Sequence, residues 1–143
     1  MSPRPNTQIT PEGFELFRDG DRELARVVRA GFAPQKSVFA TPNEFRQQLG
    51  FIVYGAGKTI GRHKHNPIRR EIVGTPEVVL VRSGRCAVDL FDDDDAPVGS
   101  VELGQGDVIV FVSGGHGFRM IEDTILLEVK QGPYTAEQDK VHF

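Results

Sequence analysis

Residues 77–91, Glu-Val-Val-Leu-Val-Arg-Ser-Gly-Arg-Cys-Ala-Val-Asp-Leu-Phe, predict two β-strands joined by a tight turn. Glu77–Arg82 and Arg85–Phe91 are short and rich in apolar, β-branched residues, and Ser83-Gly84 supplies the turn. Further strands are predicted over Phe51–Tyr54, Lys58–His65, Ser100–Leu103, Asp107–Phe111, Gly117–Ile121 and Ile125–Lys130. Many short strands separated by regular turns are typical of an all-β sandwich or barrel.

The first fifty residues are predicted to pack on this β-rich region. Residues 1–10 are predicted to be an arm, and Arg22–Phe32 matches both helical and strand spacing, with the preceding Asp-Gly turn favouring a strand. Thr41-Pro42-Asn43-Glu44 has the pattern of a capping box, so we expect a short helix over Pro42–Leu49. The predicted organisation is therefore residues 1–50 as an N-terminal layer, 51–130 as the barrel, and 131–143 as a surface tail.

Composition excludes several classes of function. The 143 residues fit one domain, and no apolar run reaches the length that spans a membrane. A net charge of −3 gives no electrostatic case for binding nucleic acid or anionic membranes. Cys86 is the single cysteine and the first residues are polar, so we expect a cytoplasmic protein without a secretory signal.

Three of the four histidines stand in contexts that predict a metal site. His63 and His65 are separated by one residue and would point to the same side of an extended strand. Glu77 directly precedes a buried apolar run, where a carboxylate needs a compensating partner, and His116 lies between two glycines that permit close approach of a ligand. Nitrogen and oxygen donors of this kind predict a divalent transition metal held by His63, His65, Glu77 and His116.

The inserted segment between His65 and Glu77 offers alternatives. Glu71 is a rival carboxylate ligand, although it stands beside Arg69 and Arg70 in what resembles a solvated loop. These two arginines could overhang the mouth of a barrel and favour a carboxylate or phosphate on the substrate, or they could simply be solvated.

These motifs resemble the cupin superfamily over roughly residues 50–130. The family's first motif is matched by His63-Lys-His65 and by Glu77 followed, after six residues, by Gly84; the second is matched in part by Gly106–Phe111 and Gly114-Gly-His116. Two departures are the eleven residues between His65 and Glu77 and the missing proline of the second motif. The resemblance implies a double-stranded β-helix, or jelly-roll barrel, with a metal in its mouth.

Several functions are compatible with that resemblance. We expect one Fe, Mn, Ni, Zn or Cu ion per chain and a metal-dependent oxygenase or isomerase acting on a small polar or anionic metabolite. One alternative is a non-catalytic cupin that binds a small ligand; another is a metal-free sugar-nucleotide isomerase or epimerase with His63 or His65 as general base. Because the first forty residues are rich in apolar side chains, we also expect a homodimer in which they pack on a second copy.

Overall fold

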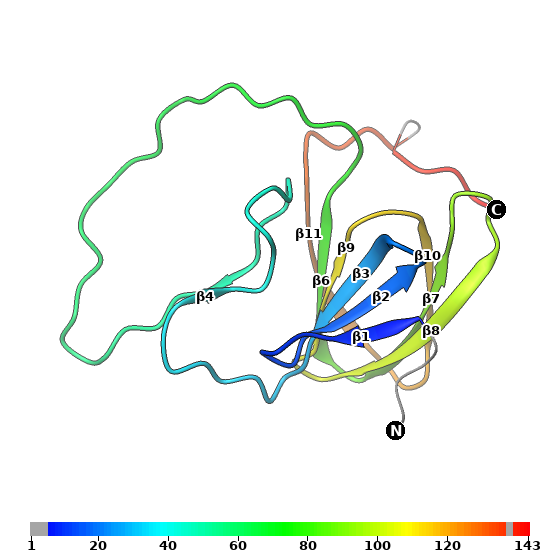
Figure 1. Ribbon diagram of the computed structural model, residues 1–143, viewed down its shortest axis with the longest axis horizontal. Helices are drawn as coiled ribbons and strands as arrows, with labels where there is room; N and C mark the ends of the chain where they lie inside the picture. Colours follow the sequence, from blue (N-terminus) through cyan, green and yellow to red (C-terminus); the bar gives the residue numbers. More distant parts are fainter. Residues whose placement is uncertain (1–5, 137–138) are drawn as a thin grey trace.

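The computed structural model describes residues 6–136 and 139–143, and these residues form strands and loops without a helix. Accordingly, no helix able to cross a membrane occurs in the described ranges. The strands, drawn in Figure 1, are β1 (Thr7–Ile9), β2 (Glu15–Asp19), β3 (Arg22–Val28), β4 (Val38–Phe39), β5 (Gly50–Phe51), β6 (Glu77–Ser83), β7 (Arg85–Phe91), β8 (Pro97–Gly104), β9 (Val108–Phe111), β10 (Gly115–Met120) and β11 (Ile125–Lys130). The predicted all-β class is confirmed.

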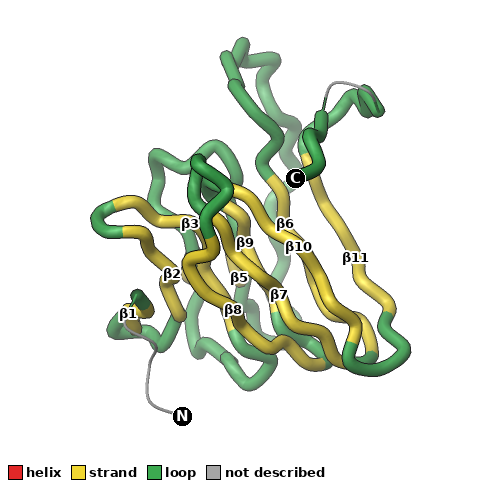
Figure 2. Tube along the Cα trace, turned by 90° about the vertical axis from the view of Figure 1, so that its right-hand side faces the viewer, coloured by secondary structure: helices red, strands yellow, loops and turns green. Residues whose placement is uncertain are grey.

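Two antiparallel sheets share one hydrophobic core. The larger sheet has six strands in the order β1-β2-β3-β9-β6-β11, and the smaller has three in the order β10-β7-β8. Figure 2 shows the smaller sheet lying across the larger one. The fully buried side chains come from both sheets, with Leu24 and Ile109 on the larger and Leu90 and Leu103 on the smaller. The apolar face of each sheet is therefore buried against the other.

The turn between β6 and β7 carries the chain from one sheet to the other. Gly84 occupies it with φ of +89°, a left-handed conformation that glycine adopts without steric cost. Thr124, which precedes β11, closes over this turn: its hydroxyl donates to the Arg85 carbonyl over 3.1 Å and accepts from the Arg85 amide over 3.2 Å. This turn sets the start of β7 relative to β6, which begins at Glu77.

The N-terminal strands are part of the larger sheet. β3 pairs with β9, β2 pairs with β3, and Thr7–Ile9, predicted as part of an arm, pair with β2. The apolar side chains that suggested contact with a second copy are buried within the same chain: Phe14, Leu16, Phe17, Val27 and Val28. Residues 1–5 of the predicted arm lie outside the described residues.

The predicted helix over Pro42–Leu49 is wrong. The Thr41 side chain accepts from the Leu49 amide over 3.0 Å and donates to Gln48 over 2.9 Å, so it closes a broad turn rather than capping a helix. The side-chain amide nitrogen of Gln48, Nε2, in turn donates to the Pro42 and Phe45 carbonyls over 2.8 and 2.7 Å. Packing of Leu49 against a small apolar cluster around Phe14 holds this turn, because tertiary contacts outweigh a weak local preference for helix.

Two predicted strands are also missing. Only Phe51 of the predicted Phe51–Tyr54 segment is in a strand, and Lys58–His65 lies in a loop that runs from residue 52 to residue 76. Figure 1 shows this loop (green) leaving the body and returning at β6. Near its ends, Val53 donates its amide to the Ser37 hydroxyl and Val73 accepts from Arg46. Lys58–His65 therefore pairs with no strand among the described residues.

Candidate metal centre

Strand alternation places Glu77 and His116 on the inward faces of the two sheets. Glu77 shares its face of β6 with Val79 and Val81, both of which are buried in the core. On β10, His116 stands directly opposite Leu90 of β7, another core residue. Residues directly opposite one another in an antiparallel pair lie on the same side of the sheet, so both side chains face the space between the sheets, at the end where β6 begins.

The two side chains meet at this end of the molecule, which we call the mouth. His116 Nε2 lies 3.5 Å from Glu77 Oε2, and the side chains are 27% and 14% exposed. The imidazole stacks on the Phe111 ring with centroids 3.7 Å apart and planes 11° from parallel. Phe111 is itself opposite Glu77 in the β6–β9 pair. The stacking fixes the plane of the imidazole, so a ring nitrogen points at the carboxylate.

A second carboxylate, that of Glu128, affects the pKa of Glu77. Burial raises the pKa of Glu77, but hydrogen bonds with His116 and Glu128 and the charge of Lys130 lower it more, to about 2. The pKa of Glu128 is raised, because its carboxyl shares a hydrogen bond with Glu77 and is partly desolvated. Glu77 is therefore ionised at neutral pH, the state in which a carboxylate binds a metal.

Glu128 and Lys130 were not identified from the sequence as site residues. In the β6–β11 pair, Glu128 is opposite Val79 and Lys130 is opposite Glu77, so both face the mouth. The available signal was the alternation along Ile125–Lys130, which puts Leu126, Glu128 and Lys130 on one face. Alternation alone could not show which face is inward, since the opposite face carries Ile125, Leu127 and Val129 and is more apolar.

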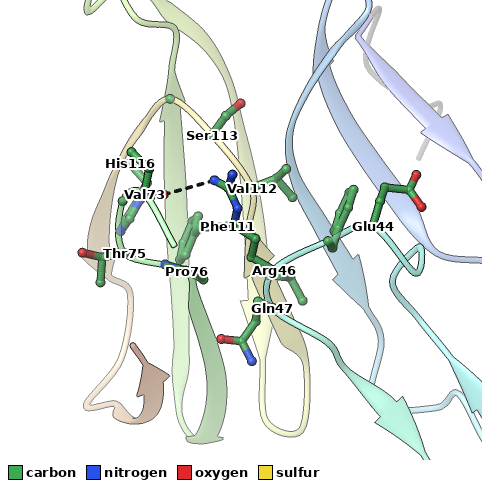
Figure 3. A pocket seen from close by; sticks show the side chains of 14 residues that line it. Glu44, Arg46, Gln47, Val73, Thr75, Pro76, Phe111, Val112, Ser113 and His116 are labelled. Carbon is green, nitrogen blue, oxygen red and sulfur yellow. Dashed lines mark hydrogen bonds between the residues drawn. The ribbon is translucent and has the colours of Figure 1, made fainter. Parts of the chain in front are cut away.

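Three described cavities have His116 in their walls. One, of about 590 Å³, is lined by β10, Phe91 and residues 141–143, and the other two lie at the mouth. The larger of these two, about 1080 Å³, is lined by Glu77, Glu128 and Lys130 and also by residues 141–143. Phe143 packs edge-on against Phe91 with ring centroids 5.1 Å apart, so the last residues border this cavity. The smaller cavity, about 470 Å³, lies between residues 44–47 and residues 73–76 and is shown in Figure 3. His116 is in the wall of both.

The two loop histidines lie apart from this pair. His63 and His65 are exposed, their ring centroids are 5.4 Å apart, and the Nδ1 of His63 lies 2.8 Å from the Gly61 carbonyl oxygen. Within residues 6–136 and 139–143, no three His, Cys, Asp or Glu side chains are grouped so that they could hold a metal. The four predicted ligands are thus present as two separate pairs.

The remaining predicted site residues are on the same loop. Glu71, Arg69 and Arg70 are all exposed, and none of them lines either cavity at the mouth. Glu77 therefore has the more suitable environment of the two carboxylates, being largely buried and in contact with a histidine.

Comparison of the chain with protein-family models, with characterised proteins and with solved structures gave no significant match.

Proposed function

We propose that this protein is a metal-dependent enzyme of the cupin type, in which His63, His65, Glu77 and His116 hold one divalent transition metal. The observation that carries the proposal is the Glu77–His116 pair, in which donors from two different sheets meet 3.5 Å apart at the mouth. The remaining nitrogen donors are already side by side on the loop. Three imidazoles and one carboxylate form a donor set suited to Fe, Mn, Ni, Zn or Cu.

The site would be completed by strand addition. β10 is an edge of the smaller sheet, with β7 as its neighbour among the described strands. If Lys58–His65 pairs with the open edge of β10, one face of the new strand carries both loop histidines toward His116. The eleven residues between His65 and Glu77 reach up to about 36 Å when extended, at roughly 3.3 Å per residue, which leaves ample length for this movement.

A second addition would close the barrel. β11 is the outer edge of the larger sheet in the described part of the chain, and Phe51–Tyr54 is a short run of aromatic and β-branched residues typical of a strand. Pairing of that segment with β11 and of Lys58–His65 with β10 would convert the two open sheets into the double-stranded β-helix that the motifs imply. Both additions would also satisfy backbone groups of two open strand edges.

The roles of the chain's own residues follow from this arrangement. Glu77 supplies a charged oxygen because its pKa is low, and the Phe111 ring holds the His116 imidazole in orientation. A bound metal would act as a Lewis acid or redox centre for isomerase or oxygenase chemistry. The larger cavity has room for a small polar metabolite, and Lys130, whose ammonium lies 3.7 Å from the Glu128 carboxylate, is in its wall.

Elemental analysis of protein purified without chelator tests the proposal. We expect one metal ion per chain, and its loss in a His63→Ala/His65→Ala double variant, because half of the ligands are then absent. Arg62→Ala/Lys64→Ala is the matched control, since it changes two residues of the same loop segment that are not proposed as ligands and should leave the metal in place. Full occupancy in the double variant would refute the proposed ligand set.

Hydrogen exchange tests the closure of the loop separately. Backbone amides of residues 58–65 should gain protection when metal is added, because strand pairing gives them partners. In His116→Ala the same addition should protect them much less, since the metal then loses its ligand on β10. Exchange that is equally fast with and without bound metal would contradict strand addition.

A non-catalytic small-ligand-binding protein is the second candidate, favoured by the size of the larger cavity, about 1080 Å³. It predicts ligand binding that is indifferent to metal content. The metal-free isomerase has less support, because it needs a tyrosine acid beside His63 or His65, and among the described residues no hydrogen bond or ring contact joins Tyr54 or Tyr134 to either histidine.

A further inference from the structure

We propose that Arg46 is the anion-recognising residue of the mouth, and that the ligand carries a small oxyanion, a carboxylate or a phosphate, bound in the smaller cavity. This inference deepens the function proposed above and rests on the same mouth, since it names the chemical class of the ligand. It concerns a residue outside the motifs that resemble the cupin family.

The backbone next to Arg46 is held in place. Arg26, which is only 7% exposed, donates to the Ala40 carbonyl over 2.6 Å and lies 5.1 Å from the centroid of the Phe45 ring. The turn is closed on its other side by the bonds of Thr41 with Gln48 and Leu49. The backbone that carries Arg46 is therefore held in place, so little backbone entropy is lost when its exposed side chain binds an anion.

The guanidinium of Arg46 has no carboxylate partner among the described residues. Its one hydrogen bond there is to the Val73 carbonyl, at 3.5 Å, which is long for such a bond. Glu44, the acidic residue nearest in sequence, points its carboxylate away from the guanidinium in Figure 3. Several arginines of the two sheets are paired with carboxylates, namely Arg22, Arg26, Arg85 and Arg119 on strands and Arg29 just after β3. Arg18 on β2 and Arg82 on β6, like Arg46, have no ion pair among the described residues.

The cavity places this cation across from the proposed metal centre. It has a volume of about 470 Å³, and its walls include Arg46, Gln47 and His116. Figure 3 shows the Arg46 guanidinium directed across it toward Val73 and the side that holds His116. Glu77 and Glu128 line the neighbouring cavity, and the acidic side chain in this wall is Glu44, whose carboxylate points away from the guanidinium in Figure 3.

The chemistry of guanidinium selects the ligand class. Its planar fork of N–H donors matches two oxygens of a carboxylate or phosphate, and such charge-assisted pairs are stronger than neutral hydrogen bonds. An oxyanion held by Arg46 would present the rest of the molecule to His116. Arg46 would thus set the orientation of the ligand, and the reaction would take place at the proposed metal centre.

Binding of malonate and of inorganic phosphate, followed by isothermal titration calorimetry and by backbone NMR shifts, tests the inference. We expect both anions to bind the full chain and to shift the resonances of His116 and Gln47. Arg46→Gln should weaken binding at least tenfold, and Arg46→Lys should weaken it less, because an ammonium keeps the charge without the fork. Arg82→Gln, at an exposed position on β6, is the matched control and should bind like the wild type.

A neutral analogue of malonate tests whether the negative charge of the ligand matters. Malonamide should bind at least tenfold more weakly than malonate. Equal affinities for malonamide and malonate would overturn the inference, and so would equal affinities of Arg46→Gln and the wild type for malonate. Stronger binding of malonate than of phosphate would identify the ligand group as a carboxylate, and the reverse as a phosphate. The metal content is measured on the same samples, so that the two proposals are tested separately. If anion binding depends on Arg46 but the protein holds no metal, only the metal centre is refuted. If the protein holds one metal per chain but anion binding does not depend on Arg46, only this inference is refuted.

Discussion

Replacing Gly84 by alanine tests the turn that joins the two sheets. The left-handed conformation at φ of +89° is unfavourable for alanine. A Cβ there would also lie 2.6 Å from Thr124 Oγ1 and 2.8 Å from Thr124 Cα, and it would strike the Asp123 carbonyl oxygen. Two of these three atoms belong to the backbone just before β11, so the clash cannot be relieved by rotating one flexible side chain.

Gly20→Ala separates the cost of a left-handed backbone conformation from the cost of the steric clash with Asp123 and Thr124. Gly20 lies in the β2–β3 turn with φ of +58°, and a Cβ there would meet nothing within 4 Å. This control carries only the conformational cost, about 1 kcal/mol, part of which is offset by reduced unfolded-state entropy. Gly84→Ala adds an overpacking cost of about 1–3 kcal/mol. We therefore expect Gly84→Ala to be less stable than Gly20→Ala by about 2 kcal/mol.

Urea unfolding followed by far-ultraviolet circular dichroism measures the difference, with the slope of the transition checked for two-state behaviour. At about 3 °C per kcal/mol for a chain of this size, the melting temperature of Gly84→Ala should be about 6 °C below that of Gly20→Ala. If the two variants have equal unfolding free energies, the contact between the turn and Thr124 does not exist as described, and the reasoning is refuted.

Three further predictions concern the site and the assembly. Glu77→Gln should reduce metal content while Glu71→Gln should leave it, and elemental analysis giving the opposite ranking would assign the ligand to the loop. In metal-free protein, the lowered pKa of Glu77 stabilises the fold above pH 4.5, and this contribution is lost as the pH falls from 4.5 to about 2. Between pH 4.5 and about 2, the free energy of unfolding should therefore fall less steeply in Glu77→Gln than in the wild type. The same pH dependence in both proteins would contradict the lowered pKa of Glu77. A homodimer would have to form through another surface than the N-terminal strands, such as the exposed Ile125, Leu127 and Val129 of the edge strand β11. Light scattering should give the mass of this homodimer, and a monomer mass at all concentrations would exclude it.

Local patterns were sufficient to predict most of the strands. Glu77–Arg82 and Arg85–Phe91 were recognised because alternation of side chains and a glycine turn are properties of neighbouring residues, and β6 and β7 match them closely. The same reasoning failed at Pro42–Leu49. There the hydroxyl expected to cap a helix bonds to Gln48 and Leu49 across the turn, a partner choice that depends on how Leu49 packs.

The sequence by itself determined the kind of side chain at each candidate position, and the tertiary structure decided which of them meet. Glu77 and His116 could be named from their contexts, but their contact requires β6 and β10 to lie in different sheets with both side chains facing inward. The stacking of Phe111 on His116, the hydrogen bond of Glu128 with Glu77, and the direction of Arg46 into a cavity are likewise long-range outcomes. The physical reason is that alternation fixes which residues share a face, whereas burial and pairing between distant strands fix what that face contacts.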